Sequence, residues 1–265
     1  LVASVEDIFN EFSGGLPDPM AIRDFLVRAQ GWQKVPRYVL LLGNGHYDYK
    51  NIRTSVRNWI PAYESVESIH QIDSYASDDH FAFLNAGNVR VSLGIGRIPV
   101  TSPEEARVAV DRIISYETAS TFSPWRNRVT YVADDGLTST RDEGNIHTYQ
   151  AELLAQSYTP ASVERKKIYI IEYPTVNSSS GRRKPAANTA IVDAINNGTL
   201  IVNYTGHGNP QLWAHEAIFT RETSLPQLTN AAMLTFVVAA TCDFARYDNP
   251  AERSAGEVIM FLDRG

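Results

Sequence analysis

Short apolar segments alternate with amphipathic segments along most of this chain, and this alternation constrains the fold more than any other feature. Segments with the length and composition of strands lie at residues 38–42, 89–98, 128–133, 167–173, 200–204 and 233–240. Segments with helical spacing or helix-start signals lie among them, at residues 103–117, 146–156 and 185–196. Because parallel strands need a long crossover, usually a helix, this order predicts an α/β fold with a mainly parallel sheet flanked by helices.

Helix starts and a change in composition indicate how the chain is divided. Asp18 and Ser102 are N-cap residues in type, and each is followed by proline, which suits the first helical position. After Pro124 the composition turns polar, and 265 residues are enough for two modest cores. We therefore expect two side-by-side α/β subdomains, residues 1–124 and residues 125–265.

Charge and hydropathy limit the classes of partner. The net charge is −6 and the chain has no basic block, which argues against nucleic acid as a partner. No run approaches the ~18–20 apolar residues of a membrane span. The chain begins at Leu1 rather than methionine, so we expect a fragment or a processed piece.

Cys242 is the only cysteine in the chain. A lone cysteine rules out an intrachain disulfide, and it rules out a cysteine-based zinc site, which needs at least two thiolates. A buried reduced thiol, an intermolecular bridge and a catalytic nucleophile remain as explanations. Free cysteines are most often buried, so the position of this one has to decide between them.

Cys242 and His207 each follow a predicted strand at its C-terminal end. In parallel α/β sheets the ligand crevice lies beyond the carboxyl ends of the strands, and the spacing of the two residues allows one crossover between neighbouring strands. The imidazole could take the thiol proton and later protonate a leaving amine. We also expect the amides of Gly208 and Cys242 to form an oxyanion hole. This placement favours a catalytic cysteine over a buried one.

Two further patterns near His207 are weaker. His215 and Glu216 begin a zinc-helix motif, but Phe219 stands where the second histidine is required, so no zinc site is expected. Trp213 lies in a polar loop shortly after His207. We expect it to wall a specificity pocket, whereas we interpret the other aromatic residues as mostly core.

Acidic pairs at Asp78-Asp79 and Asp134-Asp135 offer oxygen ligands for calcium. Their spacing matches no known calcium loop, so we favour solvated acidic turns and keep calcium as a candidate structural ion. No cofactor is required by the predicted chemistry. The glycines at 43–45 lack the lysine and hydroxyl of a phosphate loop, so we interpret them as a strand-exit turn and not as a nucleotide site.

The motifs Gly206-His207-Gly208 and Ala240-Thr241-Cys242, each after an apolar strand, resemble those of the gingipain-type cysteine peptidases, family C25. The resemblance extends to residues 91–105 and 197–208 and covers nearly the whole chain. It implies a caspase-like, gingipain-like α/β fold. It also implies a cysteine endopeptidase that acts on polypeptides through a Cys242–His207 dyad and an acyl-enzyme.

Within that family the chain is most similar to the surface sortases of the bacterial type IX secretion system, on residues 7–15, 38–45, 213–216 and 242–248. Such enzymes remove a C-terminal sorting signal from secreted cargo and can transfer the new carboxyl end to an amine. The resemblance implies secreted cargo proteins as substrates and an outer-membrane secretion partner. It also implies a location at the bacterial cell surface, either associated with the outer membrane or secreted.

The resemblance assigns roles around the dyad as well. The family acid that holds a basic substrate side chain corresponds here to Tyr173, so strict Arg or Lys specificity is not expected. Trp213 and Glu216 complete the substrate-binding candidates. The family acid that orients the histidine aligns with His147, and Glu143 just upstream is the other candidate. Further strands follow the nucleophile in the family, so we expect a C-terminally truncated catalytic subdomain.

A non-catalytic scaffold with a peptidase fold, in a surface or secretion complex, is the alternative function. The long irregular segment at residues 47–79 would serve for such contacts. A thiol and an imidazole held out of hydrogen-bond reach would favour the scaffold, because proton transfer needs that reach.

Overall fold

The computed structural model describes all residues except 66–73, 86, 88–89, 119–122, 180 and 263–265. The chain forms two compact units: residues 1–109 with 247–253, and residues 110–246 with 254–265. The expected subdomains 1–124 and 125–265 stay a prediction. None of the described helices has both the length and the apolar character needed to cross a membrane.

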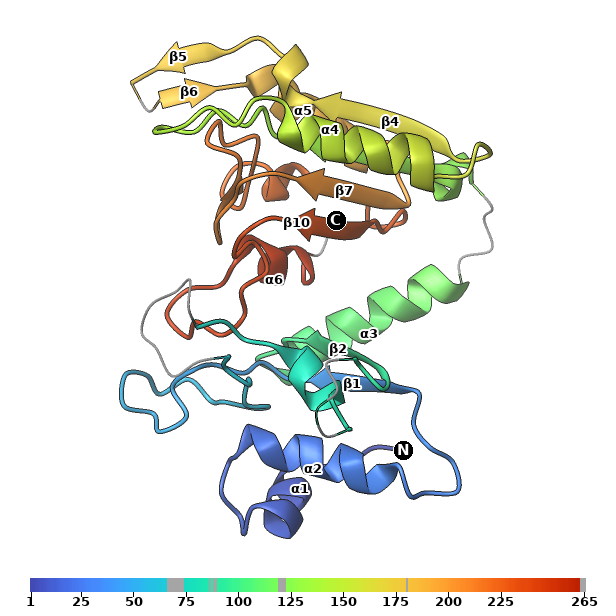
Figure 1. Ribbon diagram of the computed structural model, residues 1–265, viewed down its shortest axis with the longest axis vertical. Helices are drawn as coiled ribbons and strands as arrows, with labels where there is room; N and C mark the ends of the chain where they lie inside the picture. Colours follow the sequence, from blue (N-terminus) through green and yellow to red (C-terminus); the bar gives the residue numbers. More distant parts are fainter. Residues whose placement is uncertain (66–73, 86, 88–89, 119–122, 180, 263–265) are drawn as a thin grey trace. The chain divides into compact units, whose positions relative to one another are not determined.

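The second unit contains a four-stranded sheet whose strands follow in the spatial order β10, β7, β3 and β4. Figure 1 labels three of them, β10, β7 and β4. Their bounds are β3 Arg128–Ala133, β4 Glu164–Tyr169, β7 Ile201–Thr205 and β10 Phe236–Ala240. Each neighbouring pair is parallel. The predicted α/β fold with a parallel sheet is therefore confirmed.

Alternate residues of a strand point to opposite faces of the sheet, so apolar side chains on both faces need to be covered. In this unit helices cover both faces. Val132 and Tyr204 belong to the same buried cluster as the apolar side of α5 (Pro185–Asn196). Tyr131, the neighbour of Val132, packs instead with α4 (Ile146–Leu153). Figure 1 shows α4 lying across its face of the sheet. Two cores result, one on each side of the strands.

Shorter elements complete this unit: η2 Pro124–Asn127, a π-helical turn Leu154–Tyr158, η4 Ile170–Glu172, the β5–β6 hairpin (Val176–Ser178 and Gly181–Arg183), β8–β9 (Leu212–Trp213 and Phe219–Thr220), η5 Leu225–Gln227 and α6 Ala255–Ile259. Helix α3, Pro103–Thr118, runs from the first unit into the second. Strands β5 and β6 pair antiparallel.

The first unit is built on the parallel pair β1 (Tyr38–Leu42) and β2 (Gly94–Ile98). Its helical elements are α1 Val5–Phe12, α2 Pro19–Ala29 and η1 Asp78–Ala82. The predicted start of α2 is confirmed, because the Asp18 side chain accepts a hydrogen bond from the Met20 amide at 2.8 Å. The core of this unit joins residues of α1, α2, β1 and η1.

Arg97 ties the loops of the first unit together. Its Nε and Nη2 each donate to one oxygen of Asp78 at 2.8 Å, and its Nη1 donates to the carbonyls of Gly43 at 2.9 Å and Ile60 at 2.7 Å. The guanidinium also lies 4.6 Å from the ring centre of Tyr247. The arginine side chain is 3% exposed. Both oxygens of Asp78, one of the acids considered for calcium, are thus engaged by this arginine.

Glu152 of α4 binds the sheet through polar contacts. Its Oε1 accepts from Lys167 Nζ and from Gln156 Nε2 at 2.8 Å, and its Oε2 accepts from Tyr169 Oη at 2.7 Å. These hydrogen bonds, that of Lys167 first, hold the pKa of Glu152 at about 2. The carboxylate therefore adds stability above its ordinary pKa, and this contribution is lost as the pH falls towards 2.

We expect Glu152→Gln to lower the melting temperature near neutral pH, because the charge-assisted contacts are lost. The difference from the wild type should shrink as the pH falls from about 4.5 to about 2, where the wild-type carboxyl is itself protonated. Thermal unfolding followed at several pH values measures this convergence. Lys167→Met should give the same convergence, and a difference that stays constant with pH would contradict the assignment.

Candidate active site

The pairing of β7 with β10 brings the two predicted catalytic residues to the same edge of the sheet. Thr205 at the end of β7 stands opposite Ala240 at the end of β10, and the Gly206 amide donates to the Ala240 carbonyl at 3.3 Å. His207 and Cys242 therefore lie just beyond neighbouring strand ends, where parallel sheets form their ligand crevice. Cys242 is exposed rather than buried.

Both glycines beside this histidine are required by close packing. A Cβ on Gly206 would lie 2.3 Å from the Cβ of Asp134, and a Cβ on Gly208 would lie 2.5 Å from Thr241 Oγ1. Both distances are well inside van der Waals contact, so any larger residue would push the loop away. Gly208 packs against Thr241, the residue before the cysteine. The two loops that carry the histidine and the cysteine are thus in direct contact.

Glu143 determines which nitrogen of the His207 ring can act as a base. Its Oε2 lies 3.0 Å from His207 Nε2, and its other oxygen pairs with Arg141. Because a carboxylate only accepts hydrogen bonds, the neutral ring carries its hydrogen on Nε2 and its lone pair on Nδ1. Nδ1 is then the atom that can take a proton from a thiol. The His207 side chain is 33% exposed, so a substrate can reach it.

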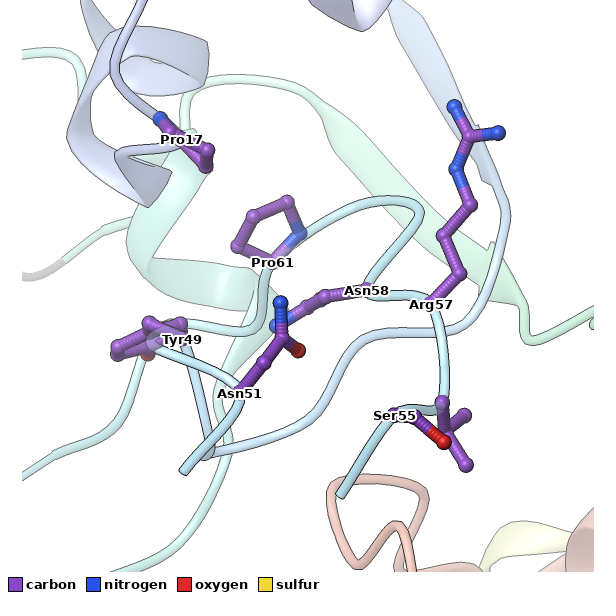
Figure 2. Close-up of a pocket in the computed structure, with 8 residues that line it drawn as sticks. Pro17, Tyr49, Asn51, Ser55, Arg57, Asn58 and Pro61 are labelled. Carbon is purple, nitrogen blue, oxygen red and sulfur yellow. The ribbon is translucent and has the colours of Figure 1, made fainter. Parts of the chain in front are cut away.

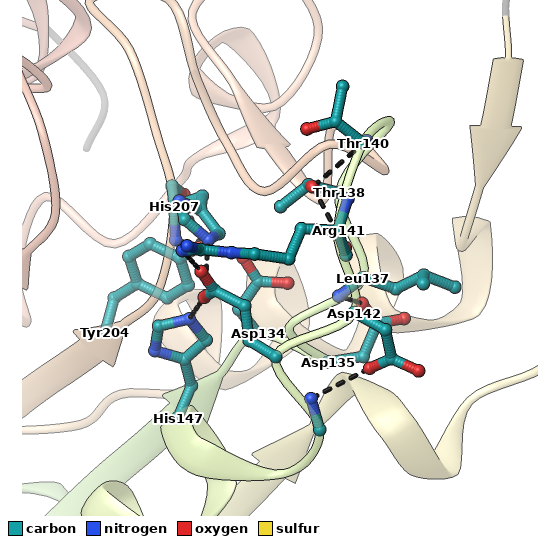
Figure 3. A network of polar contacts seen from close by, with 12 residues as sticks. Asp134, Asp135, Leu137, Thr138, Thr140, Arg141, Asp142, His147, Tyr204 and His207 are labelled. Atoms are coloured by element: carbon teal, nitrogen blue, oxygen red, sulfur yellow. Dashed lines mark hydrogen bonds and ion pairs between the residues drawn. The ribbon is translucent and has the colours of Figure 1, made fainter.

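Sequence reasoning missed two residues that hold the main chain of His207 (Figure 3). Asp134 Oδ2 accepts from the His207 amide at 2.9 Å, and Tyr204 Oη donates to the His207 carbonyl at 2.6 Å. Asp134 is 1% exposed, so the expectation of a solvated acidic turn is wrong at this position. The available signal was its place directly after the buried strand β3, which neighbours β7.

His147, the aligned candidate for orienting the catalytic histidine, lies beside Glu143 rather than in its place. Its Nε2 is 3.3 Å from Glu143 Oε2, and its ring centre is 5.2 Å from that of His207. Burial lowers the pKa of His147, which favours the neutral ring. A neutral His147 leaves the negative charge of Glu143 available to a protonated His207.

The two amides expected to form an oxyanion hole have no hydrogen-bond acceptor among the described residues. Gly208 forms a bridge with Trp213, but the two hydrogen bonds of that bridge are made by flanking residues and not by the Gly208 amide. The Cys242 amide follows the end of β10 directly. The oxyanion hole therefore stays a prediction, with both amides free to donate.

Trp213, expected to wall a pocket, is instead part of the core. It has no exposed surface, and its ring stacks on Tyr204 with the centres 4.4 Å apart. It also packs against Phe219 and Phe244. An indole buried in this way supports the strand below His207 and has no surface with which to line a pocket.

The other two substrate-binding candidates occupy different environments. Tyr173 is half-buried and packs against the core cluster on the α5 side of the sheet. Glu216 is 1% exposed and pairs with Arg182 of the β5–β6 hairpin. The structure therefore places Tyr173 nearer the surface and Glu216 inside the unit.

A separate pocket of about 320 Å³ lies in the first unit (Figure 2). Its lining is mostly polar and consists of Pro17, Tyr49, Asn51, Ser55, Val56, Arg57, Asn58 and Pro61. All of these residues belong to the first unit, whereas His207 and Cys242 belong to the second. This pocket is therefore not part of the candidate active site.

The family model and the similar proteins indicate the same family. The family model described as Peptidase family C25 matches residues 1–265. Gingipain R2 of Porphyromonas gingivalis is 28% identical over 206 residues, which are 77% of this chain and 24% of that protein. Gingipain R1 of the same species is 28% identical over 206 residues, 77% of this chain and 18% of that protein.

The fold is shared with solved structures. The crystal structure of the Arg-specific cysteine proteinase gingipain R aligns with a TM-score of 0.65 at 23% identity, over 98% of this chain and 56% of that one. A complex of the pro- and mature domains of the P. gingivalis protein RgpB aligns with a TM-score of 0.66 at 23% identity, over 96% and 52%. The chain thus spans about a quarter or less of these curated relatives and about half of the solved chains.

Proposed function

The chain belongs to peptidase family C25, and from that membership we propose that it is a cysteine endopeptidase with Cys242 as nucleophile and His207 as general acid and base. The observation that carries the proposal is the strand register. It brings the exposed thiol and the imidazole just past the ends of two hydrogen-bonded parallel strands. Neighbouring strand ends are the arrangement that a nucleophile and its base need.

Each step of the reaction has a residue on this sheet edge to perform it. His207 Nδ1 takes the proton of the thiol, and the Cys242 thiolate attacks the carbonyl carbon of the scissile bond. The Gly208 and Cys242 amides donate to the oxyanion that forms. The carbon–nitrogen bond then breaks as His207 protonates the leaving amine, which leaves a thioester between the substrate and Cys242.

The thioester can be released in two ways. A water molecule gives up a proton to His207 and attacks the thioester carbon, which yields a free carboxyl end and restores the thiolate. An amine that attacks in the same way forms a new amide bond, so the same residues support transpeptidation. Only the acyl acceptor differs between a peptidase and a sortase reaction.

Glu143 is proposed to orient His207 and to stabilise its protonated form. Glu143→Gln keeps the size of the side chain, but the glutamine amide can donate to His207 Nε2. It would then favour the tautomer with the hydrogen on Nδ1, which leaves Nδ1 unable to act as the base. We expect kcat/KM to fall by about 10²-fold or more, by analogy with other catalytic triads in which the acid is replaced by its amide. Steady-state assays with a fluorogenic peptide measure this loss.

The matched control for this variant is Glu222→Gln, an exposed glutamate of the same unit paired with Arg221. It should leave kcat/KM unchanged. Equal activity of Glu143→Gln and the wild type would remove Glu143 from the mechanism.

We further propose that the substrates are secreted cargo proteins, cleaved at a C-terminal sorting signal at the bacterial surface with an outer-membrane secretion partner. This finer assignment is supported by the resemblance of residues 7–15, 213–216 and 242–248 to type IX surface sortases. Mass spectrometry of an exported cargo protein tests it. Cells with the wild-type protein should release cargo that lacks the signal, and cells with Cys242→Ala should retain it. Cargo with the same C-terminus in both would contradict the sortase role.

A further inference from the structure

The first residue of helix α6 is bonded to the loop that carries His207. The Ala255 amide donates to the Pro210 carbonyl at 2.6 Å. Pro210 lies in the same loop as His207, between β7 and β8. Ala255 has no exposed surface. Because a buried amide that loses its acceptor is costly, the start of α6 and the loop of His207 hold each other in place.

The next residue of the helix is bonded to the loop that carries Cys242. The Gly256 amide donates to the Phe244 carbonyl at 2.8 Å, and Phe244 is anchored in the core beside Trp213. A Cβ on Gly256 would lie 2.7 Å from the Cα of Ala245. Only glycine allows this close approach, so any other residue would push the loop of Cys242 away from the helix.

A capping box holds this first turn in shape. The Ser254 amide donates to Glu257 Oε2 at 2.8 Å, and the Ser254 hydroxyl donates to the same oxygen at 3.0 Å. In return the Glu257 amide donates to Ser254 Oγ at 3.3 Å. The first four amides of a helix lack partners within it. Here the capping box satisfies the outer two, and the inner two bind the loops of the proposed dyad.

The hydrogen bond between Gly256 and Phe244 also fixes the chain that follows Cys242. Residues 247–253 belong to the first unit, although the residues on either side of them belong to the second. Phe244 stands before this segment and Gly256 after it, so their hydrogen bond ties its two ends together within the second unit. The loop of Cys242 is thus anchored by β10 before the thiol and by α6 after it.

We propose that the first turn of α6 sets the separation between the His207 imidazole and the Cys242 thiol, with Ser254 and Glu257 as positioning residues. The inference rests on the proposed peptidase function and names residues outside its chemical steps. Because one rigid turn is bonded to both loops, neither loop moves without the other. Proton transfer needs hydrogen-bond reach, and a displacement of about 1 Å can cost about 10²-fold in rate.

Peptide kinetics and thiol labelling of Ser254→Ala and Glu257→Ala test this role. Each variant breaks the capping box, so kcat for a fluorogenic peptide should fall by about 10-fold or more while KM changes little. The rate at which iodoacetamide alkylates Cys242 near pH 6 should fall towards that of free cysteine, because the base moves out of reach. Glu257→Gln should keep both rates, because glutamine also serves in a capping box.

Asp18→Ala is the matched control, because it removes a helix cap far from either loop in the sequence. Asp18 is the N-cap of α2 in the first unit and accepts from the Met20 amide. Asp18→Ala and Ser254→Ala should each lower the melting temperature by about 2–4 °C. Only Ser254→Ala should also lower kcat and the labelling rate.

Three results would overturn the inference. If Ser254→Ala and Glu257→Ala keep the kcat and labelling rate of Asp18→Ala, α6 only supports the fold, and the peptidase function stands. A loss confined to KM would place the turn in substrate binding. A wild type that neither cleaves peptides nor labels faster than free cysteine would overturn the proposed function and this inference with it. If Glu257→Ala fails to fold, Ser254→Ala, the smaller change, carries the same comparison.

Discussion

Replacing Cys242 with alanine should lower kcat/KM for peptide cleavage by about 10⁴-fold or more, because no other thiol exists in the chain to form the thioester. What remains would come only from substrate binding and the oxyanion donors. Cys242→Ser should retain little more activity, because the hydroxyl is far harder to deprotonate than a thiol. Steady-state kinetics with a peptide substrate measure both losses.

This result must be separated from a loss of structure. Cys242 is exposed, so its replacement by alanine removes little buried surface and should change the free energy of unfolding by no more than about 0.5 kcal/mol. A melting temperature equal to that of the wild type would establish that the fold is intact. Appreciable cleavage by a folded Cys242→Ala protein would show that another group is the nucleophile.

Replacing Arg97 with alanine should destabilise the first unit by about 3–5 kcal/mol, the usual cost of removing one member of a buried ion pair. The variant removes the arginine donors to both oxygens of Asp78 and to the carbonyls of Gly43 and Ile60, and leaves Asp78 only the hydrogen bond from Tyr247 Oη among the contacts described. Burial alone would lower the pKa of Arg97, but its contacts with Asp78 and Tyr247 raise it, so the guanidinium stays charged. Urea unfolding measures the loss.

Arg107→Ala is the matched control in the same unit. Arg107 is 63% exposed and pairs with Glu104 one turn away on α3, so its loss should cost at most about 1 kcal/mol. Arg97→Lys should be intermediate, because an ammonium cannot bind both oxygens of Asp78 and two carbonyls at once. Equal stability of Arg97→Ala and Arg107→Ala would contradict the role given to this arginine.

The fold class could be predicted because apolar strands and helix starts are encoded locally. The N-cap at Asp18 and the strand at residues 38–42 are confirmed. Strand β4 was expected at residues 167–173 but spans Glu164–Tyr169, followed by a 3₁₀ turn. Its start is polar because β4 pairs only with β3 at the edge of the sheet, and edge residues need not be apolar.

The site was only partly readable from sequence, for a reason of topology. The sequence places His207 and Cys242 at strand ends. It does not show which other strands lie beside those two strands in the sheet. Asp134 holds His207 because β3 lies beside β7, an adjacency set by packing and not by sequence order. Trp213 was misjudged because its polar neighbours belong to a loop that folds over the core, so their polarity indicated nothing about the indole.

The rate at which iodoacetamide alkylates Cys242 tests the proposed dyad most directly, because the single cysteine makes the label specific. The wild type should react faster than a free cysteine near pH 6, where an isolated thiol is almost entirely protonated. His207→Ala should reduce the rate to that of free cysteine, and Glu143→Gln should give a rate between the two. Equal rates for the wild type, His207→Ala and free cysteine would contradict the dyad.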